Sequence, residues 1–201
     1  MTRVLLASRN AKKLGELRRI LDAAGVAGIE LVGLADVEEF DEAPETGATF
    51  EENAVAKARD AAAATGLPSI ADDSGITVDA LNGMPGVLSA RWAGRHGDDQ
   101  ANLELLLAQT ADVPDERRGA AFVCAAALVV PEGRELVVRG EWRGTLTRKP
   151  SGTNGFGYDP IFLPEGETRT SAELDPAEKD ESSHRGRAMR LLLPHLRALT
   201  G

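Results

Sequence analysis

Two adjacent carboxylates and a hydroxyl give one stretch of this 201-residue sequence the clearest capacity for chemistry: Ala71-Asp72-Asp73-Ser74-Gly75. The stretch follows an apolar run at residues 67–71, a pattern that predicts a β-strand ending in a tight turn. Ligand groups gather at strand ends in α/β proteins. Neighbouring side chains of an extended segment point to opposite faces, so we expect one aspartate to face a site and the other the scaffold. Asp-Asp-Ser-Gly is also ordinary turn chemistry, and that alternative stays open.

A polar loop near the N-terminus is the second candidate, and it consists of Ser8, Arg9, Asn10, Ala11, Lys12 and Lys13. It lies between an apolar run at residues 4–7, a predicted strand, and apolar residues at helical spacing over 14–24. Asn10 suits an N-cap, so the free backbone N–H groups and the helix dipole favour an anion such as phosphate. The glycine-rich Walker pattern is absent, so this is not a P-loop. Two lysines in a first helical turn are also often merely solvated.

The next segments predict a strand at residues 28–34, an acidic loop at 36–45 and an alanine-rich helix. Thr49-Phe50-Glu51-Glu52 has the pattern of a capping box at the start of this helix, and Gly66 and Pro68 end it. Asn53 and Lys57 lie one turn apart on it. Such a pair on one helix face is able to reach a site, although an exposed lysine also commonly serves solubility.

The middle of the chain supplies the remaining predicted scaffold. Residues 76–78 alternate as a strand should, and Asp98 and Asp99 start a helix whose buried leucines follow. Residues 120–130 are almost wholly apolar, which is typical of a strand covered on both faces. They are expected to pair with residues 136–142 through a short turn, and this hairpin is the expected centre of the sheet.

An aromatic, glycine-rich loop at residues 150–160 is the third candidate for chemistry. Phe156 and Tyr158 have flat apolar faces of the kind that stack on a heterocycle, and glycines such as Gly157 let a backbone approach a ligand closely. Packing of both rings in the core is the alternative. The charged residues 173–181 are expected to form a loop.

His184 and Arg185 are expected just before a last helix, where they are placed to donate hydrogen bonds to a ligand. That helix covers residues 188–199 and contains Pro194, which is expected to kink it. His195 is expected on its half-buried face.

Composition excludes several classes of protein. A formal charge of −9 argues against binding a nucleic-acid backbone, although a small phosphorylated ligand remains compatible with it. Cys124 is the only cysteine and lies in an apolar run, so we expect a buried thiol and a reducing compartment. No signal-peptide pattern opens the chain, and its longest apolar run is too short to cross a bilayer. We therefore expect a cytoplasmic, soluble protein with no membrane partner and a single domain over residues 1–201.

Six motifs in this order resemble the family of non-canonical purine nucleoside triphosphate pyrophosphatases, which act on inosine and xanthosine triphosphates. They are residues 8–13, residues 45–54 (Glu45-Thr46-Gly47, Thr49-Phe50 and Glu52-Asn53-Ala54), residues 71–75, residues 155–160 (Gly155-Phe156-Gly157-Tyr158-Asp159-Pro160), Lys179, and residues 183–186 (Ser183-His184-Arg185-Gly186). The resemblance spans nearly the whole chain. Arg9 departs from it, because glycine is expected at that position of the phosphate loop.

The resemblance implies an α/β fold with a long, twisted mixed sheet flanked by helices, two lobes with a central cleft, and a homodimer. It also implies Mg²⁺-dependent hydrolysis of a purine nucleoside triphosphate between its α and β phosphates, which releases the monophosphate and pyrophosphate. Mg²⁺ prefers a few carboxylates, so we assign it to Glu45 and Asp73, with Glu39 or Asp72 nearby. Asp73 is also the expected general base.

The other expected ligand-binding residues follow from the same resemblance. The first loop, Lys57 and Ser74 are expected to hold the triphosphate and sugar. The base and its surroundings are assigned to Phe156, Gly157, Tyr158, Asp159, Lys179, His184 and Arg185.

Two alternatives belong to other classes. One is a related pyrophosphatase that acts on thymidine and uridine triphosphates, for which we would expect more arginine in the first loop and no Phe-Gly-Tyr-Asp-Pro sequence. The other is a module that binds nucleotides without cleaving them, against which the clustered acids argue because binding a polyanion needs no base. Release of pyrophosphate distinguishes these alternatives.

Overall fold

The computed structural model describes residues 1–41 and 44–200. Glu42, in the predicted acidic loop, lies outside these residues. The described strands are β1 (Thr2–Leu6), β2 (Ile29–Gly33), β3 (Ser69–Val78), β4 (Gly119–Val129), β5 (Glu135–Leu146) and β6 (Phe162–Pro164). The described helices are α1 (Ala11–Ala23), α2 (Phe50–Thr65), α3 (Asp99–Gln109), α4 (Pro176–Ser182) and α5 (His184–Arg197).

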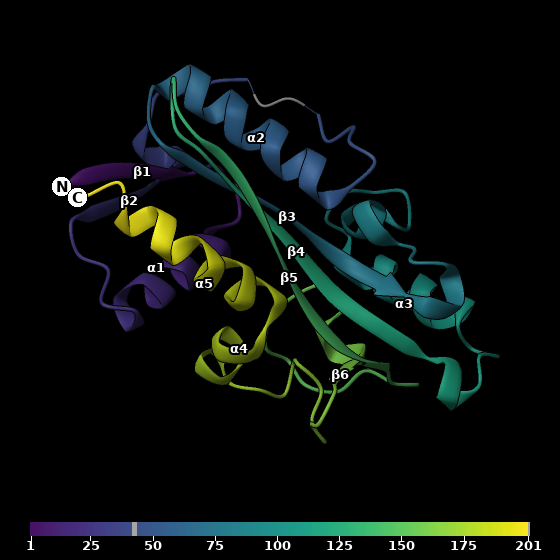
Figure 1. The fold of residues 1–201 in the computed structure, drawn as a ribbon. Helices are drawn as coiled ribbons and strands as arrows, with labels where there is room; N and C mark the ends of the chain where they lie inside the picture. The colour runs from purple at the N-terminus through teal and green to yellow at the C-terminus, as the bar shows by residue number, and fades with distance from the viewer. Residues whose placement is uncertain (42–43, 201) are drawn as a thin grey trace. The chain divides into compact units, whose positions relative to one another are not determined.

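The six described strands form one mixed sheet in the order β2-β1-β3-β4-β5-β6 (Figure 1). β1 pairs in parallel with both β2 and β3, whereas β5 and β6 are antiparallel. The mixed sheet with flanking helices confirms the predicted fold class. β4 occupies a central position as expected, but its hairpin partner β5 is second from the edge, so the hairpin as a whole is not the sheet centre.

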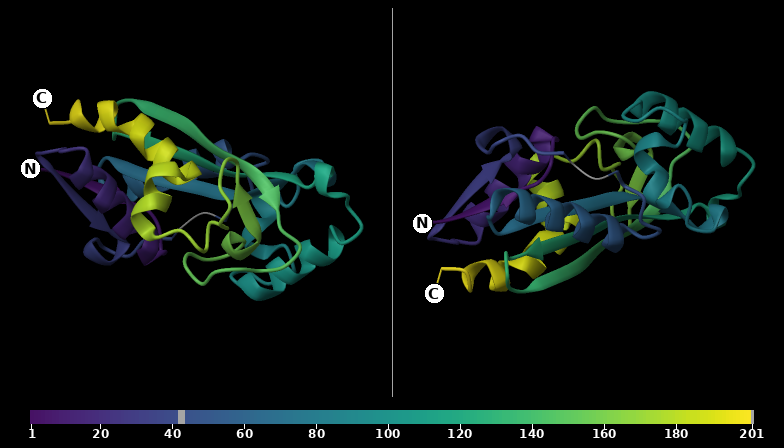
Figure 2. Two further views of the ribbon diagram at one scale, coloured as in Figure 1. Left: turned by 90° about the horizontal axis from the view of Figure 1, so that it is seen from below. Right: turned by 90° about the horizontal axis from the view of Figure 1, so that it is seen from above.

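The chain divides into two compact units. Unit 1 comprises Met1–Asp73, Cys124–Gly140 and Arg185–Gly201, and unit 2 comprises Ser74–Val123 and Glu141–His184. The two ends of the chain lie close together in unit 1, where Thr2 Oγ1 donates to Leu199 O at 3.3 Å (Figure 2). The cleft expected between two lobes stays a prediction.

Alternation along the strands sorts the core of unit 1 into two layers. Val4 and Leu6 of β1 and Ile70 of β3 pack with α1 and α5 on one face. Leu5, between them in sequence, packs instead with Ala61 of α2 on the other face. Because side chains alternate along a strand, Asp72 shares the face of Ile70, and Asp73 takes the opposite face, toward α2.

The core of unit 2 is more aromatic. Trp142 packs beside Phe162 at a centroid distance of 5.5 Å, and both belong to a buried cluster that also contains Ile76, Phe122 and Tyr158. Leu103 and Leu106 of α3 join this cluster, as the leucine spacing predicted. This unit therefore buries residues from a loop that the sequence marked as a ligand site.

Local capping signals give the helix starts. Asn10 accepts from Lys12 N, Thr49 from Glu52 N and Asp98 from Ala101 N, which confirms three predicted N-caps. The reciprocal half of the predicted capping box differs, because Glu52 Oε2 accepts from Ala48 N rather than from the N-cap residue. Gly66 ends α2 in the left-handed conformation with φ 67°, as predicted.

Three predictions of local structure are wrong. β3 does not end at the Asp-Asp-Ser-Gly sequence but continues through it to Val78. Residues 173–181 are not wholly loop, because Asp175 caps helix α4 in a capping box with Glu178. His184 and Arg185 are the first residues of α5 rather than residues before it.

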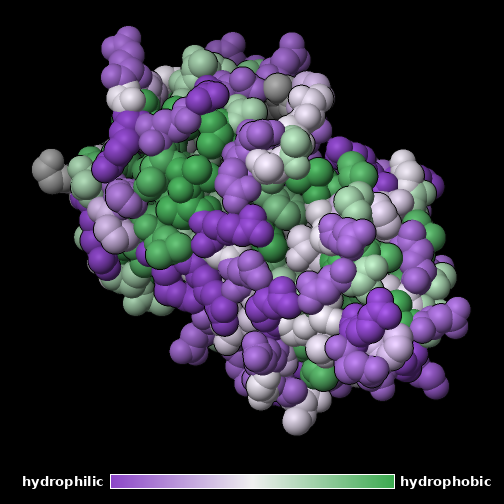
Figure 3. Space-filling view, turned by 45° about the vertical axis from the view of Figure 1, so that its right-hand side comes forward, coloured by the Kyte–Doolittle hydropathy of each residue, from purple (hydrophilic) through white to green (hydrophobic). Residues whose placement is uncertain are grey.

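Some large apolar side chains are exposed: Met1, Met84, Val137, Phe156 and Leu191. On the face shown in Figure 3, a hydrophobic area is bordered by hydrophilic residues. Among residues 1–41 and 44–200, no helix has both the length and the apolar character needed to cross a membrane.

Candidate active site

Asp72 is the buried anchor of an ion-pair network in unit 1. Its Oδ2 atom lies 2.8 Å from Lys13 Nζ and 3.4 Å from Arg185 Nε. Arg185 Nη1 also pairs with Glu16 Oε2 at 2.8 Å. These contacts join β3 to α1 and α5, so Asp72 is the aspartate that faces the scaffold.

Asp72 and Arg185 are both charged in this network, because each shifts the pKa of the other in favour of the charged form. Burial alone would raise the pKa of Asp72, but Lys13, Arg185 and Lys57 outweigh burial and hold it well below its ordinary value. For Arg185, burial would lower the pKa, but Glu16 and Asp72 raise it above its usual range. A carboxylate that neighbouring cations hold in its charged form is poorly suited to take a proton from water.

Asp73 lies in a different environment on the α2 side of β3. Its Oδ2 atom accepts from Asn53 Nδ2 at 2.9 Å, and its Oδ1 atom lies 3.9 Å from Lys57 Nζ. Burial raises the pKa of Asp73, although Lys57 and the Asn53 hydrogen bond oppose this effect. A raised pKa brings a carboxylate nearer to the range in which a general base works best.

Lys57 connects Asp73 with Glu45. Its Nζ atom lies 2.6 Å from Glu45 Oε1 and donates to the backbone O of Asp72 at 2.7 Å. Burial would lower the pKa of Lys57, but the charges of Asp72, Asp73 and Glu45 raise it above its ordinary value. The ammonium is therefore charged and held among oxygen atoms.

Metal binding depends on these same carboxylates. Glu45 and Asp73 both lie beside Lys57, and two carboxylates suit Mg²⁺ when phosphate oxygens and waters complete its shell. Asp72 was predicted as a neighbouring ligand, but its side chain belongs to the opposite face of β3. In the part of the chain that the structure describes, no group of three or more His, Cys, Asp or Glu side chains is arranged to hold a metal.

The predicted phosphate loop lies at the start of α1. Ser8 Oγ accepts from Asn10 N at 3.2 Å, and Asn10 Oδ1 accepts from Lys12 N at 3.0 Å. Lys12 is exposed, whereas Lys13 is half-buried against Asp72. The side chain of Ala11 lies outside the described part of the chain.

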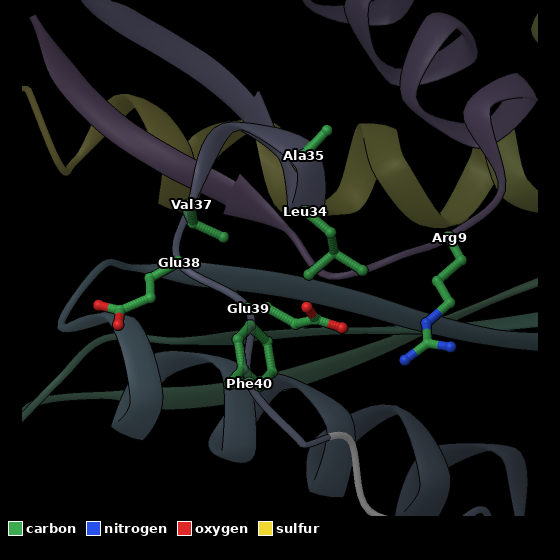
Figure 4. Close-up of a pocket in the computed structure, with 7 residues that line it drawn as sticks. All are labelled: Arg9, Leu34, Ala35, Val37, Glu38, Glu39 and Phe40. Atoms are coloured by element: carbon green, nitrogen blue, oxygen red, sulfur yellow. The ribbon is translucent and has the colours of Figure 1, made fainter.

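Arg9 lines a pocket that sequence reasoning did not predict. The pocket has a volume of about 390 Å³ and is lined by Arg9, Leu34, Ala35, Val37, Glu38, Glu39 and Phe40. Figure 4 shows the carboxylate of Glu39 turned toward the side of the pocket where the Arg9 guanidinium lies. Arg9, which stands where glycine was expected, thus lines a cavity of unit 1.

The aromatic loop of unit 2 is held by carboxylates. Asp159 Oδ2 accepts from Phe156 N at 2.9 Å and pairs closely with Lys179 Nζ. Asp99 Oδ2 accepts from Gly157 N at 3.0 Å. Gly155 has φ +78°, in the left-handed region, and a Cβ there would overlap the Asp159 carboxylate, so glycine suits this position.

The two loop aromatics have different environments. The side chain of Phe156 is 36% exposed, with Lys179 Nζ 5.7 Å from its ring centroid. Tyr158 is only 5% exposed, and its hydroxyl donates to Ser89 O at 2.8 Å. Burial, together with the charge of Asp99, raises the pKa of Tyr158 above its ordinary value. Of the two interpretations that the sequence left open for these rings, core packing therefore holds for Tyr158, whereas stacking on a heterocycle stays a prediction for Phe156.

Comparisons with known proteins match this chain over nearly its whole length. The sequence profile described as the Ham1 family matches residues 4–195. The chain belongs to the Ham1 family. The dITP/XTP pyrophosphatase of Nocardia farcinica is 74% identical over 99% of this chain and 97% of that protein.

Solved structures of similar proteins have the same fold over nearly the whole chain. The crystal structure of a nucleoside-triphosphatase / dITP/XTP pyrophosphatase from Mycobacterium abscessus is 65% identical, with a TM-score of 0.79 over 97% of this chain and all of that one. A HAM1 protein from Coxiella burnetii is 42% identical, with a TM-score of 0.88 over 98% of this chain and all of that one. The recognised resemblance is thereby confirmed.

In this Ham1-family chain, the predicted site residues fall into both units. Residues 8–13, Glu45, Lys57, Asp73 and Arg185 belong to unit 1, whereas Ser74, residues 156–159, Lys179 and His184 belong to unit 2. His184 is buried and stacks on the Phe122 ring with centroids 4.9 Å apart. Sequence reasoning missed Glu16 and Asp99, because both are ordinary helix acids whose partners are distant in sequence.

Proposed function

We propose that this chain hydrolyses non-canonical purine nucleoside triphosphates, namely ITP, dITP and XTP, to the nucleoside monophosphate and pyrophosphate. The observation that carries the proposal is the arrangement around Asp73: a buried carboxylate with a raised pKa, beside Lys57 and Glu45. The dITP/XTP pyrophosphatase named among its relatives at 74% identity supports the choice of substrate.

Different side chains of the protein activate the water and bind the triphosphate. Asp73 takes a proton from the attacking water, and Asn53 keeps the Asp73 carboxylate oriented through Oδ2. Lys57 and Lys13 supply positive charge to phosphate oxygens, with donors from Ser8 and Asn10 beside them. Lys13 has to leave Asp72 or share it to do so, because the two groups are in contact.

Mg²⁺ fits this site as a cofactor. Glu45 and Asp73 are hard oxygen donors and would hold it together with substrate oxygens. When bound, the ion lowers the pKa of water and neutralises charge on the departing pyrophosphate.

The purine is assigned to the aromatic loop of unit 2. The exposed Phe156 ring offers a stacking face, and Lys179 offers N–H donors near that ring to the 6-oxo group of inosine or xanthosine. Adenine presents an amino donor at this position instead. A buried donor without an acceptor costs about 1–3 kcal/mol, a factor of about 5 to 150 in specificity.

Arg185 and His184 were predicted as direct donors to the base. Arg185 is buried and pairs with Glu16 and Asp72, and His184 is buried and stacks on Phe122. We therefore propose that both residues act mainly by holding the start of α5, with Lys179 and the loop nearest to the base.

A panel of nucleoside triphosphates tests the function. Purified protein is incubated with Mg²⁺ and each of ITP, dITP, XTP, ATP, GTP, dTTP and UTP, and monophosphate and pyrophosphate are quantified. We expect kcat/KM for ITP and XTP to exceed that for ATP by at least about fivefold. Equal values for ATP and ITP would overturn the substrate proposal, and binding without pyrophosphate release would favour the non-catalytic module.

We further propose a cytoplasmic homodimer that does not act on nucleic acids or membranes. Met84 is 37% exposed, and Val87, Leu88 and Trp92 beside it are half-buried, so this segment carries apolar surface suited to an interface. The net charge of −9 agrees with a small-molecule substrate rather than a nucleic-acid backbone.

A further inference from the structure

We propose that the ammonium group of Lys57 occupies the place of the divalent cation between Glu45 and Asp73, so that lysine and metal compete for these carboxylates. The inference rests on the proposed function, because it concerns the same metal. It goes further by assigning Lys57 two alternating positions. Without nucleotide, Lys57 neutralises the carboxylates, and with metal and nucleotide it is released toward phosphate.

The geometry around Lys57 is that of a cation in an oxygen cage. Its Nζ atom lies 2.6 Å from Glu45 Oε1, 2.7 Å from Asp72 O and 3.9 Å from Asp73 Oδ1. These oxygens come from the loop before α2 and from β3, while Lys57 itself projects from α2. Carboxylate and backbone carbonyl oxygens are also the donors that hard divalent cations take.

The Asp73 carboxylate and the backbone of the loop that carries Glu45 have contacts that do not involve Lys57. Asn53 Nδ2 donates to Asp73 Oδ2 at 2.9 Å, while Asn53 Oδ1 accepts from Gly47 N at 2.8 Å. A Cβ at Gly47 would lie 2.6 Å from Asn53 Oδ1, so glycine allows this approach between the Glu45 loop and α2. Asn53 thus ties the loop that carries Glu45 to the strand that carries Asp73.

Charge repulsion makes it unfavourable for the Lys57 ammonium and a metal ion to lie between Glu45 and Asp73 at the same time. A unit charge about 4 Å from a monovalent ion changes its binding by about fivefold in bulk water, and by more near a protein surface. For a divalent ion the repulsion energy doubles, so the factor is squared to about 25-fold. A metal ion at Glu45 and Asp73 therefore either binds weakly beside the ammonium or displaces it.

Displacement gives Lys57 a new partner only when a polyanion is present. Its flexible four-carbon stem lets the ammonium move while its backbone stays in α2. A triphosphate offers it oxygens in exchange for Glu45, so metal and nucleotide favour each other's binding. Lys57 thereby suppresses metal binding in the absence of nucleotide.

Binding of Mn²⁺ to the full chain without nucleotide tests this inference. The parent and Lys57→Met are titrated with Mn²⁺, and free ion is measured by electron paramagnetic resonance. We expect Lys57→Met to bind Mn²⁺ at least about tenfold more tightly, since a neutral side chain no longer repels the ion. Lys149→Met, which removes the same charge from an exposed position in unit 2, should bind as the parent does.

Further variants keep the test decisive. Glu45→Gln combined with Lys57→Met should lose the tight site, which places it at the predicted carboxylates. Lys57→Gln replaces Lys57→Met if circular dichroism shows that the latter is unfolded. Affinity of the Lys57 variant within twofold of the parent, with binding that still depends on Glu45, overturns the competition but leaves the metal proposal intact. Absence of Mn²⁺ binding in every variant, with or without a non-hydrolysable nucleotide, overturns both.

Discussion

Lys13 Nζ lies 2.8 Å from Asp72 Oδ2, although the two residues are 59 positions apart in sequence. A lysine predicted to bind phosphate is thus already paired with a buried carboxylate that Arg185 also contacts. Burying Asp72 is tolerable because two cations compensate its charge. The pair fixes the start of α1 against β3, so the same contact supports the fold and positions the proposed phosphate-binding loop.

Asp72→Asn is expected to destabilise the fold by about 3–5 kcal/mol, because it leaves the buried Arg185 and the half-buried Lys13 with a neutral partner. Urea unfolding at neutral pH measures this change. Asp36→Asn is the comparison for which we expect a smaller loss, because the Asp36 carboxylate is exposed and accepts from Gly33 N in a turn. A loss below 1 kcal/mol would mean that the network contributes little.

The stability contributed by Asp72 is expected to disappear in acid. Its folded pKa is lowered, and its unfolded value is about 3.9, so the contribution is fully present above that unfolded value. As pH falls through and below this value, only the unfolded chain takes up the proton, and the contribution is lost progressively. The difference in unfolding free energy between parent and Asp72→Asn should therefore shrink between pH 5 and pH 2. A constant difference would contradict the assignment.

Asp73→Asn is expected to retain the fold but to lose about 10²–10⁴-fold in kcat, since the amide cannot accept the proton. Steady-state hydrolysis of ITP measures the loss, and thermal unfolding checks the fold. Asn53→Ala should give a smaller loss, because it removes only the hydrogen bond that orients Asp73. Turnover within tenfold of the parent would exclude Asp73 as the base.

Phe156→Ala and Tyr158→Ala should separate stacking from packing. Phe156 is 36% exposed, so its removal is expected to raise KM for every purine nucleotide with little effect on stability. Tyr158 is core, and its truncation is expected to cost about 3–5 kcal/mol of stability, as for a buried phenyl ring. Unfolding curves and KM values are compared for both variants. The reverse pattern would return the stacking role to Tyr158.

Asp99→Ala should loosen the aromatic loop without touching the nucleotide. Its carboxylate accepts from Gly157 N, and one net hydrogen bond is worth about 0.5–1.5 kcal/mol, so KM for ITP is expected to rise about two- to tenfold. Asp99→Asn retains an acceptor and should restore most of the affinity. If both variants behave alike, the charge of Asp99 rather than its hydrogen bond is responsible.

The dimer proposal predicts a single species of twice the 21.3 kDa chain mass in sedimentation velocity at micromolar concentration. Replacing the exposed Met84 by aspartate should shift this species toward the monomer, because a charge would be buried at the interface. Sedimentation of the parent as a monomer alone would refute the proposal.

The sequence by itself determined the elements whose signals are local. Asn10, Thr49 and Asp98 start helices because each side chain satisfies a backbone N–H two or three residues away. The apolar run of β4 needs no distant partner to be recognised, since such a run is typical of a strand covered on both faces. The start of helix α4 could also have been predicted from the sequence, because Asp175, Pro176 and Glu178 form a capping pattern within four residues.

Only the tertiary structure decided what Asp72, Tyr158 and Lys57 do. Asp72 continues a strand rather than forming a turn because cations 59 and 113 positions away neutralise it in the interior. Tyr158 enters the core because its hydroxyl finds the Ser89 carbonyl, 69 positions away. Such partners cannot be read from neighbouring residues, since the free energy of burying a charge or a hydroxyl depends on which distant groups the fold brings within hydrogen-bonding distance.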